Sequence, residues 1–450
     1  MTDPAPPEKA RTLEQIRRLC KPKPLEGEML RYFVETDEAR DPRQNTRGLI
    51  LDALEAGEDV HVLLYGHRGC GKSTELNKLL DENRDAFIPV TFDVQKEIPP
   101  ASLLAEDLIL VIVERVFSVL TKEEKLSLDS QTLQKVHEYF AETTEIEKET
   151  REAALAAGAG MDMGESVAGK LLGFFAKFRA DIQAGTRSET TSVVKLRQRP
   201  AELLDQANLV FESARKALRQ AGRHLLVVVE GLDKVSISQA RGVFVENVNL
   251  LTGLRTNVIY TIPIWLFHSP DAGVFKHHFD ETVAQPMIKV VEPGAGRAAG
   301  HEVVRRVVLS RIAAEAIDDA AVDLLIQKTG GVLRDAFQVL KTAAGTRDAS
   351  LPLRSDHVRY GLDKVRAELA RQVTLPMDGR DWGPLSVSDL FDRLGDYARK
   401  HRSGKKIPVV SDPVNQILLQ SGALVEYDGQ GWLGVHPLLL EHLQEMGEVS

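Results

Sequence analysis

The sequence predicts an α/β fold in which helices cover both faces of a parallel sheet. Short apolar segments alternate with helical ones, which is the pattern of βαβ units. The first apolar segment leads into a glycine-rich loop, and a helix with Leu76, Leu79 and Leu80 on one side follows the loop from Lys72. Five segments are predicted as strands: residues 61–65, 88–94, 224–229, 257–262 and 287–291.

The glycine-rich loop fits G-x-x-x-x-G-K-[ST], the P-loop pattern, at every fixed position. Backbone N–H groups of such a loop surround phosphate oxygens, its lysine neutralises the β- and γ-phosphates, and its hydroxyl is available to Mg²⁺. A chance match is the alternative, and the flanking strand and helix argue against it. We therefore predict binding of ATP and Mg²⁺ by the loop residues: Gly66, His67, Arg68, Gly69, Cys70, Gly71, Lys72, Ser73 and Thr74.

The composition is that of a large globular protein. The chain has 450 residues, 43% hydrophobic and 27% charged, which suffices for several domains of roughly 150 residues. Its net charge of -9 gives no overall attraction to nucleic acid or acidic membranes. The two cysteines, Cys20 and Cys70, form no disulfide framework, and no window of ~18 apolar residues could span a bilayer. The N-terminus has no apolar signal-peptide core, so we expect a cytoplasmic protein.

A P-loop also needs an acidic residue at the end of a neighbouring buried strand, to hold Mg²⁺. The most strand-like run of the chain, residues 225–229, ends in Glu230-Gly231-Leu232-Asp233. Parallel strands of open α/β sheets bind ligands at their carboxyl ends, so these acids are placed suitably. The alternative is a buried strand that happens to be followed by an acidic turn.

With these two motifs, residues 33 to 345 resemble the AAA+ and STAND ATPases. AAA+ proteins have two adjacent acids after the strand, whereas Gly231 follows Glu230 here. STAND proteins of the NACHT type have the order acid, glycine, apolar residue, acid, which this segment matches. The resemblance implies that Glu230 is a magnesium ligand, with Ser73, and that Asp233 is the general base. Glutamate stands where aspartate is more usual, which implies slow hydrolysis.

The same resemblance implies two residues that detect the γ-phosphate. Thr261, near the end of the segment 257–262, stands where these families have a polar sensor, although threonine is also simply a good strand residue. Arg334, in the segment GGVLRD, resembles the sensor 2 arginine of replication initiators and transposition ATPases. A surface arginine after ordinary glycine turn chemistry is the alternative for Arg334.

Residues 32 to 40 lie where the relatives have the stretch that packs on adenine. Tyr32, Phe33 and Val34 suit a flat base, and Arg40 could stack on it or donate to it. A capping strand followed by an exposed acidic turn explains the same residues equally well.

The chain is expected to divide into five parts. A stretch with Leu171, Leu172, Phe174, Phe175 and Phe178 should pack on the chain itself or on a neighbouring subunit rather than on lipid. The parts are a flexible segment 1–30, the ATPase core 31–120 and 201–296, a helical and aromatic insertion 121–200, a helical lid 297–371, and a winged-helix-like domain 372–450.

The winged-helix-like domain does not favour DNA binding. It has seven Lys and Arg against eleven Asp and Glu, and its groove-entering helix, DPVNQILLQSG, has no basic residue. We therefore expect an ATP-hydrolysing switch whose ATP or ADP state controls oligomerisation, most simply of identical chains, or capture of an unknown protein partner. The alternative is a DNA-associated ATPase resembling initiators or transposition regulators. A metabolic kinase is disfavoured, because no acceptor-site pattern is present.

Overall fold

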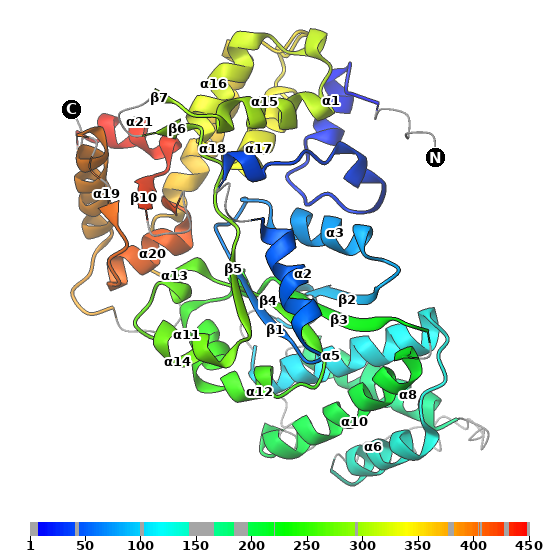
Figure 1. The fold of residues 1–450 in the computed structure, drawn as a ribbon. Coiled ribbons are helices and arrows are strands. Elements are labelled where there is room, and N and C mark those ends of the chain that lie inside the picture. Colours follow the sequence, from blue (N-terminus) through cyan, green and yellow to red (C-terminus); the bar gives the residue numbers. More distant parts are fainter. Residues whose placement is uncertain are drawn as a thin grey trace, which may run out of the picture.

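A five-stranded parallel sheet lies at the centre of the computed structural model, in the order β2-β3-β4-β1-β5 (Figure 1). Every residue of β1 and β4 is buried, as expected for strands covered on both faces. The predicted α/β fold class is confirmed, and so are four of the five predicted strands. The strands are β1 (His61–Tyr65), β2 (Phe87–Asp93), β3 (His224–Glu230), β4 (Asn257–Ile262) and β5 (Glu281–Ala284).

The structure describes residues 8–40, 45–99, 103–143, 166–183, 197–219, 221–292, 296–376, 382–403, 405, 407–426 and 432–447. In these ranges no helix has the length and apolar character needed to cross a membrane.

The predicted fifth strand at 287–291 is wrong. The fifth strand of the sheet is β5, which pairs with β1 from Val62 to Tyr65. The later segment is apolar for another reason: it runs beneath the lid, where a side chain on Gly331 would lie 2.1 Å from the carbonyl oxygen of Ile288. Of the predicted segment only Val291 lies in a strand, β6 (Val291–Glu292), which pairs with β7 (Gly296–Arg297) outside the main sheet.

Helices cover both faces of the sheet. On one face, α2 (Thr46–Ala56) and α3 (Lys72–Glu82) bury Ile50, Leu76 and Leu79 against alternate strand residues. The other face is covered by α5 (Ala105–Ser118), α10 (Pro200–Arg219) and the shorter helices between β3 and β5. Those shorter helices are α11 (Ile237–Arg241), α12 (Val248–Thr252), α13 (Ile264–Phe267) and α14 (Ala272–Phe275).

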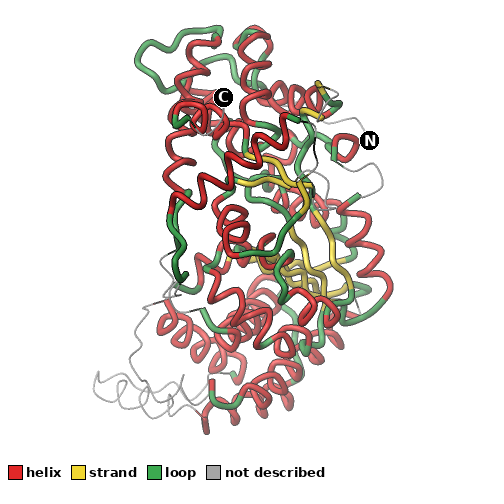
Figure 2. The backbone as a smooth tube through the Cα atoms, turned by 90° about the vertical axis from the view of Figure 1, so that its left-hand side faces the viewer, coloured by secondary structure: helices red, strands yellow, loops and turns green. Residues whose placement is uncertain are grey.

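The insertion between β2 and β3 forms a helical bundle at the end of the molecule away from the lid (Figures 1 and 2). In it, α6 (Ser130–Thr143) and α8 (Val167–Gln183) pack beside α5 and α10. The aromatic rings of Phe174 and Phe175 pack against Phe140 of α6, with ring centroids 4.7 and 5.5 Å away. The predicted aromatic cluster is therefore an intrachain core, and this structure does not offer it to a second subunit.

Residues 8–30 differ from the expected flexible segment, of which residues 1–7 lie outside the described ranges. Helix α1 (Leu13–Leu19) has a capping box formed by Thr12 and Gln15, and it packs on the lid helix α17. Ala10 pairs with Ile312, and Leu25 is buried. The segment is held because its apolar residues contribute to the main core.

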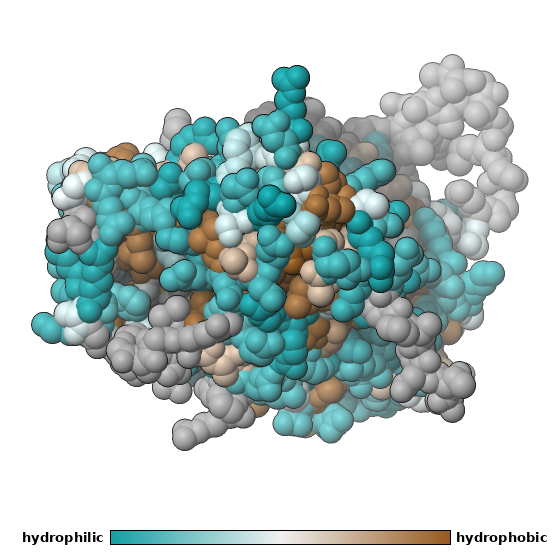
Figure 3. All heavy atoms as spheres, turned by 90° about the horizontal axis from the view of Figure 1, so that it is seen from above, coloured by the Kyte–Doolittle hydropathy of each residue, from teal (hydrophilic) through white to brown (hydrophobic). Residues whose placement is uncertain are grey.

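Two groups of elements follow the sheet along the chain, one helical and one mixed. The first contains α15 (Gly300–Arg311), α16 (Asp319–Thr329), α17 (Leu333–Ala343) and α18 (Ser355–Gln372). The second contains α19 (Val387–Arg402), β8 (Ile407–Pro408), α20 (Pro413–Ser421), β9 (Leu424–Glu426), β10 (Trp432–Val435) and α21 (Pro437–Glu445). We call these groups the lid and the C-terminal domain. Both lie at the loop end of the sheet, and from above their surface is largely hydrophilic with separate hydrophobic patches (Figures 1 and 3).

Candidate nucleotide site

The glycine-rich loop connects the carboxyl end of β1 to the N-terminus of α3. Gly71 caps α3 in the left-handed conformation, with φ 107°, and the first N–H groups of the helix have no acceptor within the helix. A cavity of about 590 Å³ adjoins the loop. Its other walls are residues 22–26 and 32–36, the ends of β2 and β3, and the lid helices α15 and α17. The dimensions and the N–H groups suit a nucleoside phosphate.

Lys72 is buried beside Asp233, which lies in the turn after β3. Its Nζ lies 2.9 Å from Asp233 Oδ2 and donates to the carbonyl oxygens of Gly66 and His67 at 2.8 and 3.1 Å. Burial lowers the pKa of Lys72, but the Asp233 carboxylate outweighs burial and leaves that pKa above its ordinary value. Burial opposes ionisation of Asp233, yet Lys72 holds the pKa of Asp233 below its usual range. Both groups are therefore charged at neutral pH.

Ser73 and Glu230 meet across the cavity floor. The Ser73 hydroxyl donates to Glu230 Oε2, and burial raises the pKa of Glu230 despite this hydrogen bond. The described residues contain no cluster of three potential metal-ligating acids, histidines or cysteines. Mg²⁺ does not need one, because it typically takes one or two protein oxygens and completes its shell with phosphates and water. The Ser73 and Glu230 oxygens fit that requirement and would hold the ion against a bound triphosphate.

One acidic residue near this floor was missed by the sequence analysis. Asp93 ends β2 directly beside Glu230 in the strand register, and its Oδ2 lies 3.4 Å from Lys234 Nζ. Gly231 is required here: its φ is 88°, and a Cβ would lie 2.1 Å from Asp93 Oδ1. The signal was an acid at the end of a predicted strand, but only the strand order reveals that β2 and β3 are neighbours.

Arg40 differs from its expected contact with adenine. It is only 3% exposed, and its guanidinium donates to Thr36 Oγ1 at 2.8 Å, to the Cys70 carbonyl at 2.8 Å and to the Pro286 carbonyl. Buried backbone carbonyls need donors, and Arg40 supplies them to the loop residue Cys70 and to Pro286. Arg40 also lines the cavity.

The hydroxyls of two predicted site threonines bond to the protein backbone, although Thr74 lines the cavity. Thr74 Oγ1 accepts the backbone N–H of Leu25 at 3.1 Å, which ties the N-terminal segment to α3. Thr261 is 1% exposed, and its hydroxyl donates to the Val229 carbonyl at 3.3 Å within the sheet. Thr261 does not line the cavity. The cavity brings together the loop with Lys72, Ser73, Glu230 and Asp233.

Arg334 of the lid touches the loop. It lies in the first turn of α17, and a Cβ on Gly69 would be 2.7 Å from Arg334 Cβ. Gly69 has φ 85° and must be glycine for the lid to approach this closely. The exposed Arg334 side chain has no ion pair or hydrogen bond with any described residue, and it lines the cavity. The structure thus places a free guanidinium beside the loop.

The C-terminal domain touches the same loop. His67 is buried, and its Nε2 accepts the backbone N–H of Glu426 at 2.6 Å. Burial, aided by Lys72, lowers the pKa of His67 to about 3, so the ring is neutral and can accept. Cys70 of the loop packs in one small apolar cluster with Val332 of the lid and Trp432 of the C-terminal domain. Arg68 donates from Nη2 to the carbonyl of Lys234 at 3.2 Å.

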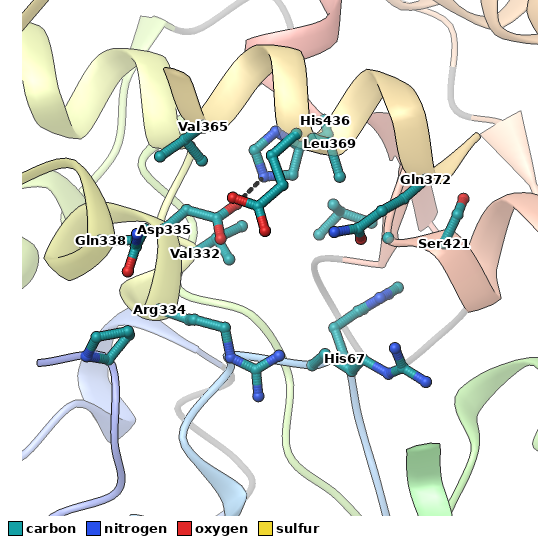
Figure 4. Close-up of a pocket in the computed structure, with 15 residues that line it drawn as sticks. His67, Val332, Arg334, Asp335, Gln338, Val365, Leu369, Gln372, Ser421 and His436 are labelled. Carbon is teal, nitrogen blue, oxygen red and sulfur yellow. Dashed lines mark ion pairs between the residues drawn. The ribbon is translucent and has the colours of Figure 1, made fainter. Parts of the chain in front are cut away.

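A second cavity of about 360 Å³ lies where the loop, lid and C-terminal domain meet (Figure 4). Arg334 and His67 lie along one side of it, and the ion pair between His436 and Asp335 lies across from them, with Nε2 and Oδ2 3.1 Å apart. His436 Nδ1 accepts the backbone N–H of Leu438 at 3.2 Å. Arg334 therefore separates the nucleotide cavity from the junction of the domains.

Comparison with known proteins gives structural likenesses but no sequence match. No protein family and no curated protein matches the chain by sequence. Among solved structures, the chain is similar to a Walker-type ATPase of Pyrococcus abyssi, with a TM-score of 0.44 and 12% identity over 92% of this chain and 99% of that one. At this level the likeness carries no functional argument, and the case for function is made by the site itself.

Proposed function

We propose that the protein is an ATP-binding and ATP-hydrolysing switch of the AAA+ or STAND type, whose nucleotide state controls self-association or capture of a protein partner. One observation carries the proposal: three residues of the loop contact three different parts of the structure. His67 binds Glu426 of the C-terminal domain, Gly69 contacts Arg334 of the lid, and Lys72 pairs with the core acid Asp233. A ligand on this loop can therefore bias every domain contact.

The ion pair of Lys72 supports hydrolysis as well as binding. The Asp233 carboxylate neutralises the Lys72 ammonium in this structure. The β- and γ-phosphates of ATP would compete with Asp233 for that ammonium, because a P-loop lysine binds these phosphates. Asp233 is then free to accept a proton from a water molecule that attacks the γ-phosphate. Glu230 and Ser73 hold Mg²⁺, and Arg334 is placed to meet the γ-phosphate from the lid.

The strand order supports the AAA+ and STAND assignment. One strand, β4, lies between the loop strand β1 and the acidic strand β3, and this order is typical of those ATPases. The acid-glycine-apolar-acid segment favours the STAND type, and Gly231 has a physical reason to be there in its contact with Asp93.

The DNA-associated alternative is less well supported. Helix α20, which would enter a DNA groove in a winged helix, packs against α13 of the core. Val414, Ile417, Leu418 and Leu419 are buried, and among residues 413–421 only Pro413 is exposed. DNA reading would require the domain to leave the core. A mobility-shift series across salt concentrations, in ATP and in ADP, separates the proposals because phosphate-dominated binding falls steeply with salt.

Calorimetry on Lys72→Ala tests the proposal. Losing a charged donor to the phosphates costs about 1.5–3 kcal/mol, so we expect ATP affinity to fall at least roughly tenfold. Lys135→Ala is the control, since Lys135 is an exposed lysine of α6 in the bundle away from the loop. Equal ATP affinity of both variants and the parent would overturn the nucleotide assignment.

A further inference from the structure

A buried arginine lies in the nucleotide cavity beyond the phosphate loop. Arg311, the last residue of α15, is 6% exposed and lines the cavity. Its guanidinium carbon lies 3.7 Å from the ring centroid of Phe337. Phe337 follows Arg334 by three residues, so it lies about one turn further along α17 than the arginine that touches the loop. This end of the cavity is also lined by Phe33, Val34 and Val307.

The hydrogen-bonding capacity of Arg311 is mostly unused. A guanidinium has five N–H donors. In the described ranges, Nη1 donates to the Leu19 carbonyl at 3.2 Å, no carboxylate pairs with Arg311, and Nε is enclosed without a partner. Burial lowers the pKa of Arg311 to about 10, so the group is still charged at neutral pH. Nη2 has no hydrogen-bond partner among the described residues.

A charged side chain that is buried without a counter-ion is expensive and usually marks a functional contact. The surroundings of Arg311 are apolar and aromatic, which suits a flat heterocyclic ring better than a phosphate. A purine ring has a planar apolar face that can lie on these walls. It also has acceptor nitrogens in the ring plane that can accept a hydrogen bond from the guanidinium.

We propose that Arg311 reads the nucleobase: a guanidinium N–H of Arg311 donates to one ring nitrogen of adenine, while the apolar lining residues Phe33, Val34 and Val307 lie against the base. The inference rests on the proposed ATP-binding function and deepens it, because it assigns base selection to a residue outside every recognised motif of the sequence. Arg311 thereby also connects the base to the N-terminal segment, through the Leu19 carbonyl.

The experiment measures affinities by calorimetry for ATP, for tripolyphosphate, and for the three deaza analogues of ATP that replace N1, N3 or N7 by C–H. The parent is compared with Arg311→Met, which keeps the packing on Phe337. Arg306→Met is the control, because Arg306 lies on the same helix and pairs with Glu38 at the surface. We expect one analogue to bind the parent roughly 10- to 100-fold more weakly than ATP. Arg311→Met should weaken ATP similarly, lose the discrimination, and bind tripolyphosphate as the parent does.

Three results would overturn the inference. If the parent binds all three analogues as tightly as ATP, no ring nitrogen is read, whether or not Arg311→Met folds. If the variant still discriminates against the same analogue, another group reads the base. If the variant weakens tripolyphosphate and ATP equally, Arg311 only positions the N-terminal segment. A parent that binds tripolyphosphate and no ATP contradicts this inference, whereas a parent that binds neither contradicts the proposed function itself.

Discussion

The imidazole of His67, inside the phosphate loop, accepts a hydrogen bond from the backbone N–H of Glu426, 359 residues further along the chain. The Glu426 carboxylate in turn lies 3.0 Å from Nε2 of His268 in the core. The C-terminal domain is thus attached to the loop through one strand end. Any ligand that moves the loop acts directly on this attachment.

Substitution of His67 should loosen the C-terminal domain. His67→Ala leaves the buried Glu426 N–H without an acceptor, at a cost of about 1–3 kcal/mol. We expect faster amide hydrogen exchange at Glu426 and in β10, measured by mass spectrometry. His277→Ala, an exposed histidine of the core, is the control. Unchanged exchange in His67→Ala would show that the hydrogen bond does not hold the domain.

The two acids at the end of β3 should have separable effects. Asp233→Asn removes the proposed base, so we expect single-turnover hydrolysis to slow by roughly 10²-fold or more while ATP still binds. Glu230→Gln removes a magnesium oxygen, so its binding of ATP should require more Mg²⁺. Hydrolysis by Asp233→Asn at the parent rate would place the base elsewhere, and Asp93, which lies beside Glu230 in the strand register, would be the next candidate.

Glu75 should make stability depend on pH. It is buried in α3, with Oε2 3.2 Å from Arg47 Nε, and burial raises its pKa to about 7. Its unfolded pKa is about 4.3, so the fold favours the protonated form. The stability it contributes is present below about pH 4 and is lost as pH rises through about 7.

Thermal unfolding of the parent and of Glu75→Gln at a series of pH values tests this pH dependence of stability. The parent should lose more stability than the variant between pH 5 and pH 8, by on the order of 2 kcal/mol. Parallel pH profiles of parent and variant would mean that Glu75 titrates normally in the folded protein. Glu82→Gln, on the same helix but partly exposed, serves as the control.

The aromatic core of the insertion should matter for stability rather than for assembly. Phe175 is 1% exposed and packs on Phe117 and Phe140. Phe175→Ala should therefore destabilise the bundle by about 3–5 kcal/mol. Light scattering in ATP should give the same mass as the parent at temperatures where the variant is folded. A change of mass without loss of stability would restore the surface as a subunit contact.

Local pattern predicted the parts of this site that are contiguous in sequence. The loop, its strand and the acids after β3 were found because each motif is complete within a few residues. Residues 287–291 were mistaken for a strand because burial under Gly331 produces the same apolar run as burial in a sheet. Arg40, Arg311 and the contact of His67 with Glu426 depend on segments brought together by the fold, and no spacing in the sequence reveals them.

The distance between the core and the C-terminal domain tests the switch most directly. Val274→Cys on α14 and Met446→Cys beyond α21 can carry a fluorophore pair, since these sites are 52% and 47% exposed and the native Cys20 and Cys70 are buried. We expect the efficiency of energy transfer to differ between the ATP-bound and the ADP-bound parent. The Arg334→Ala variant should bind both nucleotides but give the same efficiency with each. Identical transfer in ATP and ADP for a parent that binds both would contradict the account.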